Sequence, residues 1–491
     1  MIYPDMRIDD ILRTWYMSGN CMSLLEILEL INEYFWYIPL VLIVCLGLYG
    51  TFKLKGIQIR DFKEMFKVTF SKDEHKKGTL STLQVFCVSM GNRIGVGNIT
   101  GPVMAITVGG PGAIFWMWIF AILGMASSAI ETTIGQLYKV RGEDGEYHGG
   151  PAYTILNGLN MRRVAMFVAG VMILMYIVGF VSMEVSGMTN ALCGAFDFEY
   201  NNVFFAILLT ALTAGIIIGG LQRIANISLW LVPAMALLWL VLAVVSIALS
   251  AGGIVNAFVM IFQYAFNVPA AIGGTFGAMI LIGMKRGVLS NEAGIGTITN
   301  VSSMADVEHP VKQGLSQALG VLIDTVISTL TALVILSYGS IETIMNVKKT
   351  YDLDATNLLQ YVLEDTIGGA APYLVALFLF VFAFTCLMGD YVIGENNLAF
   401  ITKNKKGKYA IIAILLAIVF LSSFYASDEI IAIVDILLAV CGVINCLVMF
   451  KLAGKAVELY HDYRAQKAAG KETPVFSKDI LSDTSGITEW E

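Results

Sequence analysis

Residues 89–102 read Ser89-Met90-Gly91-Asn92-Arg93-Ile94-Gly95-Val96-Gly97-Asn98-Ile99-Thr100-Gly101-Pro102. This stretch lies in an apolar segment long enough to cross a bilayer, yet it holds four glycines, two asparagines, an arginine and a proline. Backbone N–H and C=O groups cannot stay unbonded in hydrocarbon, so a helix interrupted at this depth must line a cavity or water path. The stretch therefore predicts two half-helices whose junction holds a small solute and a cation.

The composition indicates an integral membrane protein. Of 491 residues, 57% are hydrophobic and 14% are charged, and the mean hydropathy is +0.73. A soluble domain carries about 25% charged residues. This deficit and the many long apolar runs predict an all-α polytopic membrane protein, with the lipid bilayer as its surroundings and no nucleic-acid partner. The seven cysteines are scattered without a Cys-x-x-Cys pair and are expected to be reduced packing residues.

The apolar runs predict about eleven transmembrane helices. One of them precedes the interrupted segment, and nine follow it. The expected spans are residues 36–52, 80–107, 113–138, 164–192, 203–219, 225–250, 255–284, 313–338, 372–396, 409–425 and 430–452.

Lysine and arginine predict the orientation through the positive-inside rule. The loops at 53–78, 139–163, 285–312 and 403–408 are basic, whereas the alternate loops are acidic or short. Eleven crossings then place the N-terminus outside and the C-terminus in the cytoplasm. The expected organisation is an outer or interfacial segment (1–35), a transmembrane domain (36–455) and a cytoplasmic tail (456–491).

A second interruption lies five crossings after the first. Residues 267–277 read Asn-Val-Pro-Ala-Ala-Ile-Gly-Gly-Thr-Phe-Gly inside the expected span 255–284. Two Gly/Pro-interrupted helices at matching places in two halves are typical of inverted-repeat transporters, and such breaks form the binding site. The pattern predicts a five-plus-five helix core with one extra N-terminal helix.

The backbone of the first break offers N–H donors for an anionic group and carbonyl oxygens for a cation. The N–H groups of Gly95 and Gly97 can face an anionic substrate group at a positive half-helix end. The carbonyls of Gly91 and Ile94 and the side chain of Asn98 can face a monovalent cation, because small hard cations prefer oxygen ligands. The alternative is close helix packing through glycines, which is common in membranes.

Charged side chains inside predicted spans are functional candidates, and five of them stand out. They are one arginine and four carboxylates: Arg93, Glu131, Glu184, Asp324 and Asp390. The excess of acid means that some carboxylates are protonated, face water or bind a cation. The alternative for Arg93 is a structural pair with one of the acids.

Thr385 and Cys386 offer a hydroxyl and a thiol at mid-membrane. Thr385 is a candidate cation ligand, or else a threonine bonded to its own helix. No nucleophile–base pair, metal cluster or phosphate loop stands out, so no enzymatic activity is expected.

Four further motifs stand out, namely Gly95–Gly101, Gly109–Trp118, Gly149–Tyr153 and Lys285–Gly294. Together they resemble the bacterial alanine/glycine:cation symporter family. The resemblance implies eleven helices, an inverted-repeat core, a bacterial cell membrane, and sodium-coupled uptake of a small amino acid with no cofactor other than the coupling ion. It also places substrate and sodium around Gly91–Asn98 and the second broken helix.

The chain departs from the family pattern at four places. Val96 replaces a threonine between the two glycines, and Glu184 lies in Met183-Glu184-Val185-Ser186 where the family has Val-Gln-x-Asn. Thr385–Asp390 replaces Ser/Thr-Thr-x-x-Gly-Trp, which puts Cys386 at a hydroxyl position and Asp390 at the tryptophan. One hypothesis is that Arg93 and Asp390 form a pair that favours a more polar substrate.

These observations predict a sodium-coupled importer of a small amino acid. The alternative is a proton-coupled or uncoupled transporter or a sensor of the same fold, with a different amino-acid-like ligand. The predicted substrate-binding residues are Arg93, Gly95, Val96, Gly97, Glu184, Gly273, Gly274, Gly277 and Asp390. The predicted cation-binding residues are Gly91, Ile94, Asn98, Asp324, Thr385 and Cys386.

Overall fold

The computed structural model describes residues 23–71, 79–143, 145–196, 198–266, 276–425 and 428–490. Within these residues, seven helical segments are long and apolar enough to cross a membrane, in agreement with the predicted all-α membrane class. The remaining expected crossings are divided or shorter, so eleven uninterrupted helices are not observed. The seven segments are Leu24–Lys53, Ala113–Leu137, Arg162–Ala195, Gly220–Leu249, Val311–Tyr338, Ala371–Ile401 and Glu429–Ala468.

The long segments correspond to one helix or to several in series. The helices are α2 (Leu24–Phe35), α3 (Tyr37–Lys53), α8 (Ala113–Leu137), α10 (Arg162–Ile173), α11 (Val181–Ala195), α13 (Gly220–Leu249), α17 (Val311–Tyr338), α20 (Ala371–Ile401) and α22 (Asp428–Ala468). Shorter elements connect or flank them. These are α4 (Ile57–Arg60), α5 (Phe62–Thr69), β1 (Val140–Arg141), β2 (Tyr147–His148), α9 (Pro151–Leu159), α12 (Asn201–Ile217), α16 (Thr299–Ser302), α18 (Ile341–Thr350), α19 (Ala355–Ile367) and α21 (Lys405–Ser422).

The first predicted break is present. Ser81 caps the start of α6 (Thr82–Arg93) with a capping box. The Ser81 hydroxyl accepts a hydrogen bond from the Gln84 backbone N–H, and the Gln84 side-chain oxygen accepts one from the Ser81 backbone N–H. The helix ends before Ile94, whose ψ of 79° leaves the helical region. A second helix, α7 (Gly97–Gly109), begins after Val96. The apolar segment therefore crosses as two half-helices.

Pro102 opens a further gap inside α7 that another helix fills. Proline has no N–H, so the carbonyl four residues earlier, that of Asn98, loses its helical donor. The hydroxyl of Thr331 on α17 donates to this carbonyl at 3.1 Å. The α7–α17 contact thus satisfies a backbone group that the sequence itself leaves open.

The second predicted break lies between α14 (Gly253–Phe266) and α15 (Phe276–Asn291). The residues between these helices, including Gly273 and Gly274, lie outside the described residues. Gly277 is the second residue of α15 and is exposed. Glycine lets α15 approach α8 closely further along, because a Cβ at Gly283 would lie 2.4 Å from the Ala113 carbonyl oxygen.

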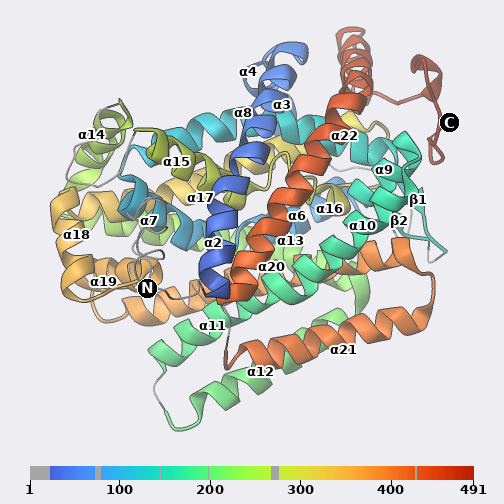
Figure 1. Cartoon of the computed structure of the whole chain (residues 1–491). Helices are drawn as coiled ribbons and strands as arrows, with labels where there is room; N and C mark the ends of the chain where they lie inside the picture. Colours follow the sequence, from blue (N-terminus) through green and yellow to red (C-terminus); the bar gives the residue numbers. More distant parts are fainter. Residues whose placement is uncertain are drawn as a thin grey trace.

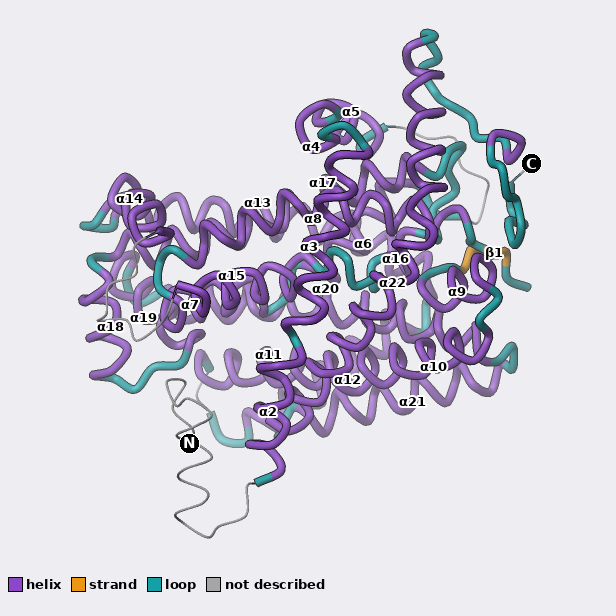
Figure 2. The backbone as a smooth tube through the Cα atoms, turned by 45° about the horizontal axis from the view of Figure 1, so that its top comes forward, coloured by secondary structure: helices purple, strands orange, loops and turns teal. Residues whose placement is uncertain are grey.

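The helices form one body with α8 and α17 packed against each other at its centre (Figure 1). In both views α14, α18 and α19 lie together on one side, and α9, β1 and the C-terminal end lie on the opposite side (Figures 1 and 2). The α12 and α21 helices are adjacent at one edge of the body. This arrangement encloses the α6–α7 junction between α8, α11, α17 and α20.

The expected span 164–192 contains a π-helical stretch that the sequence pattern did not predict. Residues Leu174–Phe180 link α10 to α11 with π-helical turns. Such turns are frequent at functional sites. Here Tyr176 is fully buried, and its hydroxyl lies 3.3 Å from both carboxylate oxygens of Glu292.

The chain beyond the last span is packed against the body. Helix α22 continues past residue 455, the expected end of the transmembrane domain, as far as Ala468. Residues 469–490, here called the C-terminal segment, then fold back. The Phe476 amide donates to the Glu308 carbonyl at 2.9 Å, and the Trp490 indole donates to the Gln136 carbonyl at 3.2 Å. Both aromatic side chains are buried.

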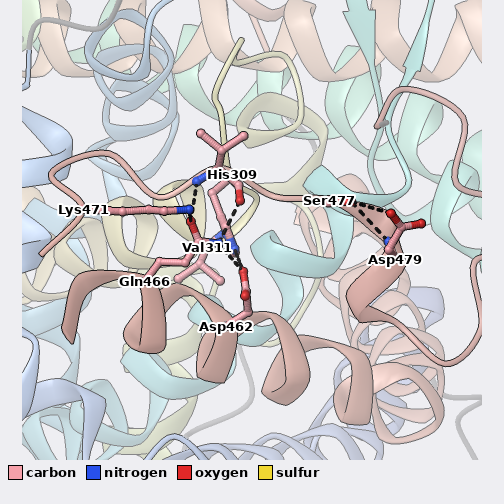
Figure 3. Close-up of polar contacts among 8 residues, drawn as sticks. His309, Val311, Asp462, Gln466, Lys471, Ser477 and Asp479 are labelled. Atoms are coloured by element: carbon pink, nitrogen blue, oxygen red, sulfur yellow. Dashed lines mark hydrogen bonds and ion pairs between the residues drawn. The ribbon is translucent and has the colours of Figure 1, made fainter. Parts of the chain in front are cut away.

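His309 links the loop before α17 to this region (Figure 3). Its Nδ1 accepts from the Val311 amide at 3.2 Å, so in the neutral ring the proton is on Nε2, which faces Asp462 Oδ2 at 3.2 Å. Burial lowers the pKa of His309 to about 4, against the opposing effect of Asp462. At physiological pH the His309 imidazole is therefore neutral, and its Nε2–H donates a hydrogen bond to Asp462 instead of forming an ion pair with it.

We expect acidification to loosen this contact. The unfolded chain protonates His309 near pH 6.5, whereas the folded protein keeps it neutral down to about pH 4. The stabilisation is therefore complete above about pH 6.5 and is lost as the pH falls towards 4, by at most about 3 kcal/mol. Thermal unfolding of the purified protein across this range measures the effect. His309→Gln should flatten the pH dependence, whereas the control His461→Gln, at an exposed position on α22, should not. An unchanged slope in His309→Gln would contradict the assignment.

Candidate functional site

The α6–α7 junction presents one free backbone donor. The Gly95 amide donates to the Arg93 carbonyl at 3.1 Å, and the Val96 amide lies 3.5 Å from Glu184 Oε2. The Gly97 amide has no acceptor among the described residues. Gly97 is exposed, and a Cβ added there would meet nothing within 4 Å. The positive N-terminal end of α7 therefore faces open space with its Gly97 N–H available to an anionic group.

The next residue, Asn98, belongs to a buried cluster of oxygen-bearing side chains. Its Nδ2 lies 2.5 Å from Asp324 Oδ1, 3.1 Å from Ser290 Oγ and 3.2 Å from Ser328 Oγ. The Ser290 hydroxyl also donates to Asp324 Oδ2 at 2.6 Å. The structure thus brings together the two predicted cation ligands Asn98 and Asp324. It adds Ser290 and Ser328, which the sequence interpretation had not assigned to cation binding.

The hydrogen bonding of this cluster is incomplete in a way that suits a cation. An amide nitrogen has two hydrogens for the three acceptors around Nδ2, and Asn98 Oδ1 has no donor among the described residues. Turning the amide over would direct Oδ1 at the same place and create a site of oxygen atoms only. A carboxylate, two hydroxyls and an amide oxygen are suitable ligands for a small hard cation such as sodium.

The other predicted cation ligands lie apart from this cluster. The Thr385 hydroxyl donates to the Phe382 carbonyl of its own helix at 2.8 Å, as the alternative interpretation expected. Gly91 packs against Thr385, and Cys386 Sγ donates to the Asn92 carbonyl at 3.0 Å. Ile94 is buried at the end of α6. The structure therefore divides the predicted cation set between two places, Asn98–Asp324 and the α6–α20 contact.

Arg93 is buried but is not paired with Asp390, so that hypothesis was wrong. Its guanidinium donates to the Gln317 carbonyl at 3.2 Å and to Ser128 Oγ at 3.3 Å, and it forms no ion pair within 4 Å in the described part of the chain. Its strongest electrostatic neighbours are Asp324, Glu292 and Glu131. Arg93 points from α6 towards α8 and α17, whereas Asp390 belongs to α20.

Two of these carboxylates are held by neutral donors. Glu131 accepts from the Gly294 amide at 3.1 Å and from Asn445 Nδ2 at 3.0 Å. Glu292 accepts from the Thr297 hydroxyl at 2.7 Å and from Tyr176. The sequence interpretation had not singled out Glu292 as a buried acid, because it follows α15 in a polar motif rather than an apolar run. The motif Ser290–Gly294 itself was the available signal.

Glu184 and Asp390 come from α11 and α20, which pack against each other. Glu184 is 7% exposed and Asp390 is 1% exposed. A Cβ placed on Gly95 would lie 2.7 Å from Glu184 Oε1 and 3.2 Å from Cys386 Sγ. Val96 packs near Gly187, which lies on α11 together with Glu184. The positions that depart from the family pattern therefore all border the α6–α7 junction or its neighbouring turn of α20.

Comparison with known proteins identifies the family. A model of the sodium:alanine symporter family matches residues 22–478. This protein belongs to that family. Among its relatives, the amino-acid carrier protein AlsT and the probable sodium/glutamine symporter GlnT, both of Bacillus subtilis, are each 36% identical to it. AlsT aligns over 95% of this chain and 97% of its own length, and GlnT over 95% and 96%.

A third relative is archaeal. The sodium/alanine symporter AgcS of Methanococcus maripaludis is 33% identical over 65% of this chain and 72% of its own length. As a member of the sodium:alanine symporter family, this chain is a multi-pass membrane transporter protein. The coupling ion of this family is sodium.

Proposed function

We propose that this protein imports a small amino acid together with sodium across a bacterial plasma membrane. The observation that carries the proposal is the adjacency of two features on the first turn of α7. Gly97 offers a free N–H, and the side chain of Asn98 belongs to the oxygen cluster with Asp324. The substrate carboxylate would bind at Gly97, and sodium at Asn98, Asp324, Ser290 and Ser328.

The same adjacency provides a route for coupling. A cation bound to Asn98 would fix the first turn of α7, which carries the Gly97 N–H. Each ligand would then bind more tightly in the presence of the other, as thermodynamic linkage requires. The relatives carry alanine and glutamine in their names, which supports a small neutral or polar amino acid as substrate.

The proposed orientation follows the basic loops. The loop after α8, the loop before α17 and the C-terminal segment all meet on one side of the molecule. The basic stretch after α3, with Lys53, Lys55, Arg60, Lys63 and Lys67, meets the end of α22, where Glu64 pairs with Lys467. By the positive-inside rule we place this side in the cytoplasm and the N-terminus outside. Residues 36–455 remain the proposed transport domain, with α18 and α19 on the outer side.

Ligand-dependent thermal stability tests this proposal on the purified full-length protein. A ligand that binds only the folded state raises the unfolding temperature. We expect alanine, glutamine or another small amino acid to raise it in sodium chloride, and to raise it much less in choline chloride of equal concentration. Equal stabilisation in both salts would favour the proton-coupled or uncoupled alternative, and no stabilisation by any amino acid would contradict amino-acid binding.

A further inference from the structure

Asp390 is a buried carboxylate without a hydrogen-bond donor. It is 1% exposed, and neither Oδ1 nor Oδ2 has a partner among the described residues. Every other acid of the candidate site accepts at least one hydrogen bond from a neutral group. A charged carboxylate in this state is strongly unfavourable inside a membrane protein unless a positive charge joins it.

The surroundings of Asp390 are rich in acceptors. Asn92 Oδ1 is also buried without a donor, and it lies 2.5 Å from the place of a Cβ on Gly389, the residue before Asp390. Cys386 precedes Asp390 by one helical turn, so the two share a face of α20. Cys386 and the Glu184 carboxylate both border Gly95. Three acidic or carbonyl side chains, those of Asn92, Glu184 and Asp390, therefore surround the same turn of α20.

No basic side chain of the described chain balances this group. Arg93, the buried cation on α6, bonds to Gln317 and Ser128 and has Asp324, Glu292 and Glu131 as its electrostatic neighbours. Neither Glu184 nor Asp390 forms an ion pair within 4 Å in the parts that the structure describes. The oxygen cluster proposed for sodium is a separate set, on α7, α15 and α17.

We propose that Asp390 and Asn92 bind a second positive charge carried by the substrate, while Glu184 binds its α-ammonium, so that this transporter prefers an amino acid with an ammonium group on a short side chain. The inference rests on the proposed function. The Glu184 carboxylate lies at the Val96 N–H, one residue from the free Gly97 N–H. A substrate carboxylate at Gly97 places the α-ammonium beside Glu184 and directs the side chain towards Asp390.

A pair of nearly isosteric ligands tests the charge preference. The ligands are 2,4-diaminobutyrate and homoserine, which differ by an ammonium or a hydroxyl at the end of the same side chain. The half-saturating concentration of each for thermal stabilisation is measured with the full-length protein in sodium chloride at pH 6.5. We expect the wild-type protein to bind 2,4-diaminobutyrate at least about tenfold more tightly than homoserine, because each ion pair removed at a desolvated site costs well over one order of magnitude.

Variants that remove one carboxylate at a time test which residue causes the preference for 2,4-diaminobutyrate. Asp390→Asn should bind the two ligands with equal affinity, because the preference for 2,4-diaminobutyrate depends on the Asp390 charge. Glu184→Gln should weaken both ligands, because each carries an α-ammonium. The matched control is Glu143→Gln, whose carboxylate is exposed and pairs with the exposed Lys403, and it should behave as wild type.

Several results would overturn the inference. One is equal or tighter binding of homoserine by the wild-type protein. Another is a preference that persists in Asp390→Asn, and a third is an Asp390→Asn variant that changes only the sodium requirement, which would assign the charge to a free cation. If Asp390→Asn does not fold, the wild-type ligand ratio together with Glu184→Gln decides.

The same measurements separate this inference from the proposed function. If alanine and homoserine bind with sodium but 2,4-diaminobutyrate binds no more tightly, this inference fails and the proposed function stands. If no amino acid binds, both fail.

Discussion

Replacing Asp324 with asparagine is expected to lower sodium-driven uptake by about 100-fold or more. Among the described residues, Asp324 is the only carboxylate that forms hydrogen bonds with Asn98 and Ser290. It is fully buried on α17, so its negative charge would act on a cation at the proposed site with little screening by water. Loss of one member of a desolvated charge pair removes about 2–5 kcal/mol, and each 1.4 kcal/mol is tenfold in affinity.

Uptake by proteoliposomes as a function of external sodium measures this effect. Thr325→Val is the matched control, because Thr325 is the next residue of α17 and its hydroxyl donates only to the Val321 carbonyl of its own helix. The control should keep wild-type sodium dependence. A sodium half-saturation in Asp324→Asn that stays within about threefold of wild type would refute the assignment of the cation to this cluster.

Replacing Arg93 with methionine is expected to destabilise the folded protein by about 3–5 kcal/mol. The side chain is 3% exposed, and its charge lies among those of Asp324, Glu292 and Glu131. Removing the guanidinium takes away the positive charge that these three carboxylates share. The Gln317 carbonyl would also lose its donor from the arginine.

Thermal unfolding and the yield of monodisperse protein report this loss. Arg162→Met, at an exposed position at the start of α10, controls for the loss of an arginine and should leave stability nearly unchanged. Arg93→Lys should lie between wild type and Arg93→Met, since lysine keeps the charge but not the planar fork. An Arg93→Met protein as stable as the control would show that the buried acids need no cation.

The broken helix at Ile94–Val96 was predictable because its cause is local. Glycines at 91, 95, 97 and 101 and Pro102 weaken the helix within the same fourteen residues, whatever surrounds them. Asn98 and Asp324 were predicted individually, because polar groups inside apolar runs stand out. The sequence analysis placed both residues in one cation site, but it did not predict the hydrogen bond between them.

Contacts between distant helices were not predictable from residue types. Ser290 and Ser328 are 38 positions apart and join the cluster only because α15 and α17 pack beside α7. Arg93 and Asp390 were paired in the sequence hypothesis by charge alone, but Arg93 leaves α6 towards α8 and α17. The π-helical stretch Leu174–Phe180 has the apolar composition of an ordinary membrane helix, so its sequence does not distinguish it from one. The same holds for the C-terminal segment, whose buried Phe476 and Trp490 are separated by a mostly polar stretch.

Flux across a sealed membrane tests the central claim most directly. Proteoliposomes that contain the full-length protein would receive radiolabelled alanine, glutamine or 2,4-diaminobutyrate with an inward sodium gradient. We predict that at least one of these amino acids accumulates above its external concentration, and that the accumulation collapses when sodium is equilibrated or replaced by choline. Equal uptake in sodium and choline, or equilibration without accumulation, would contradict sodium-coupled symport by this protein.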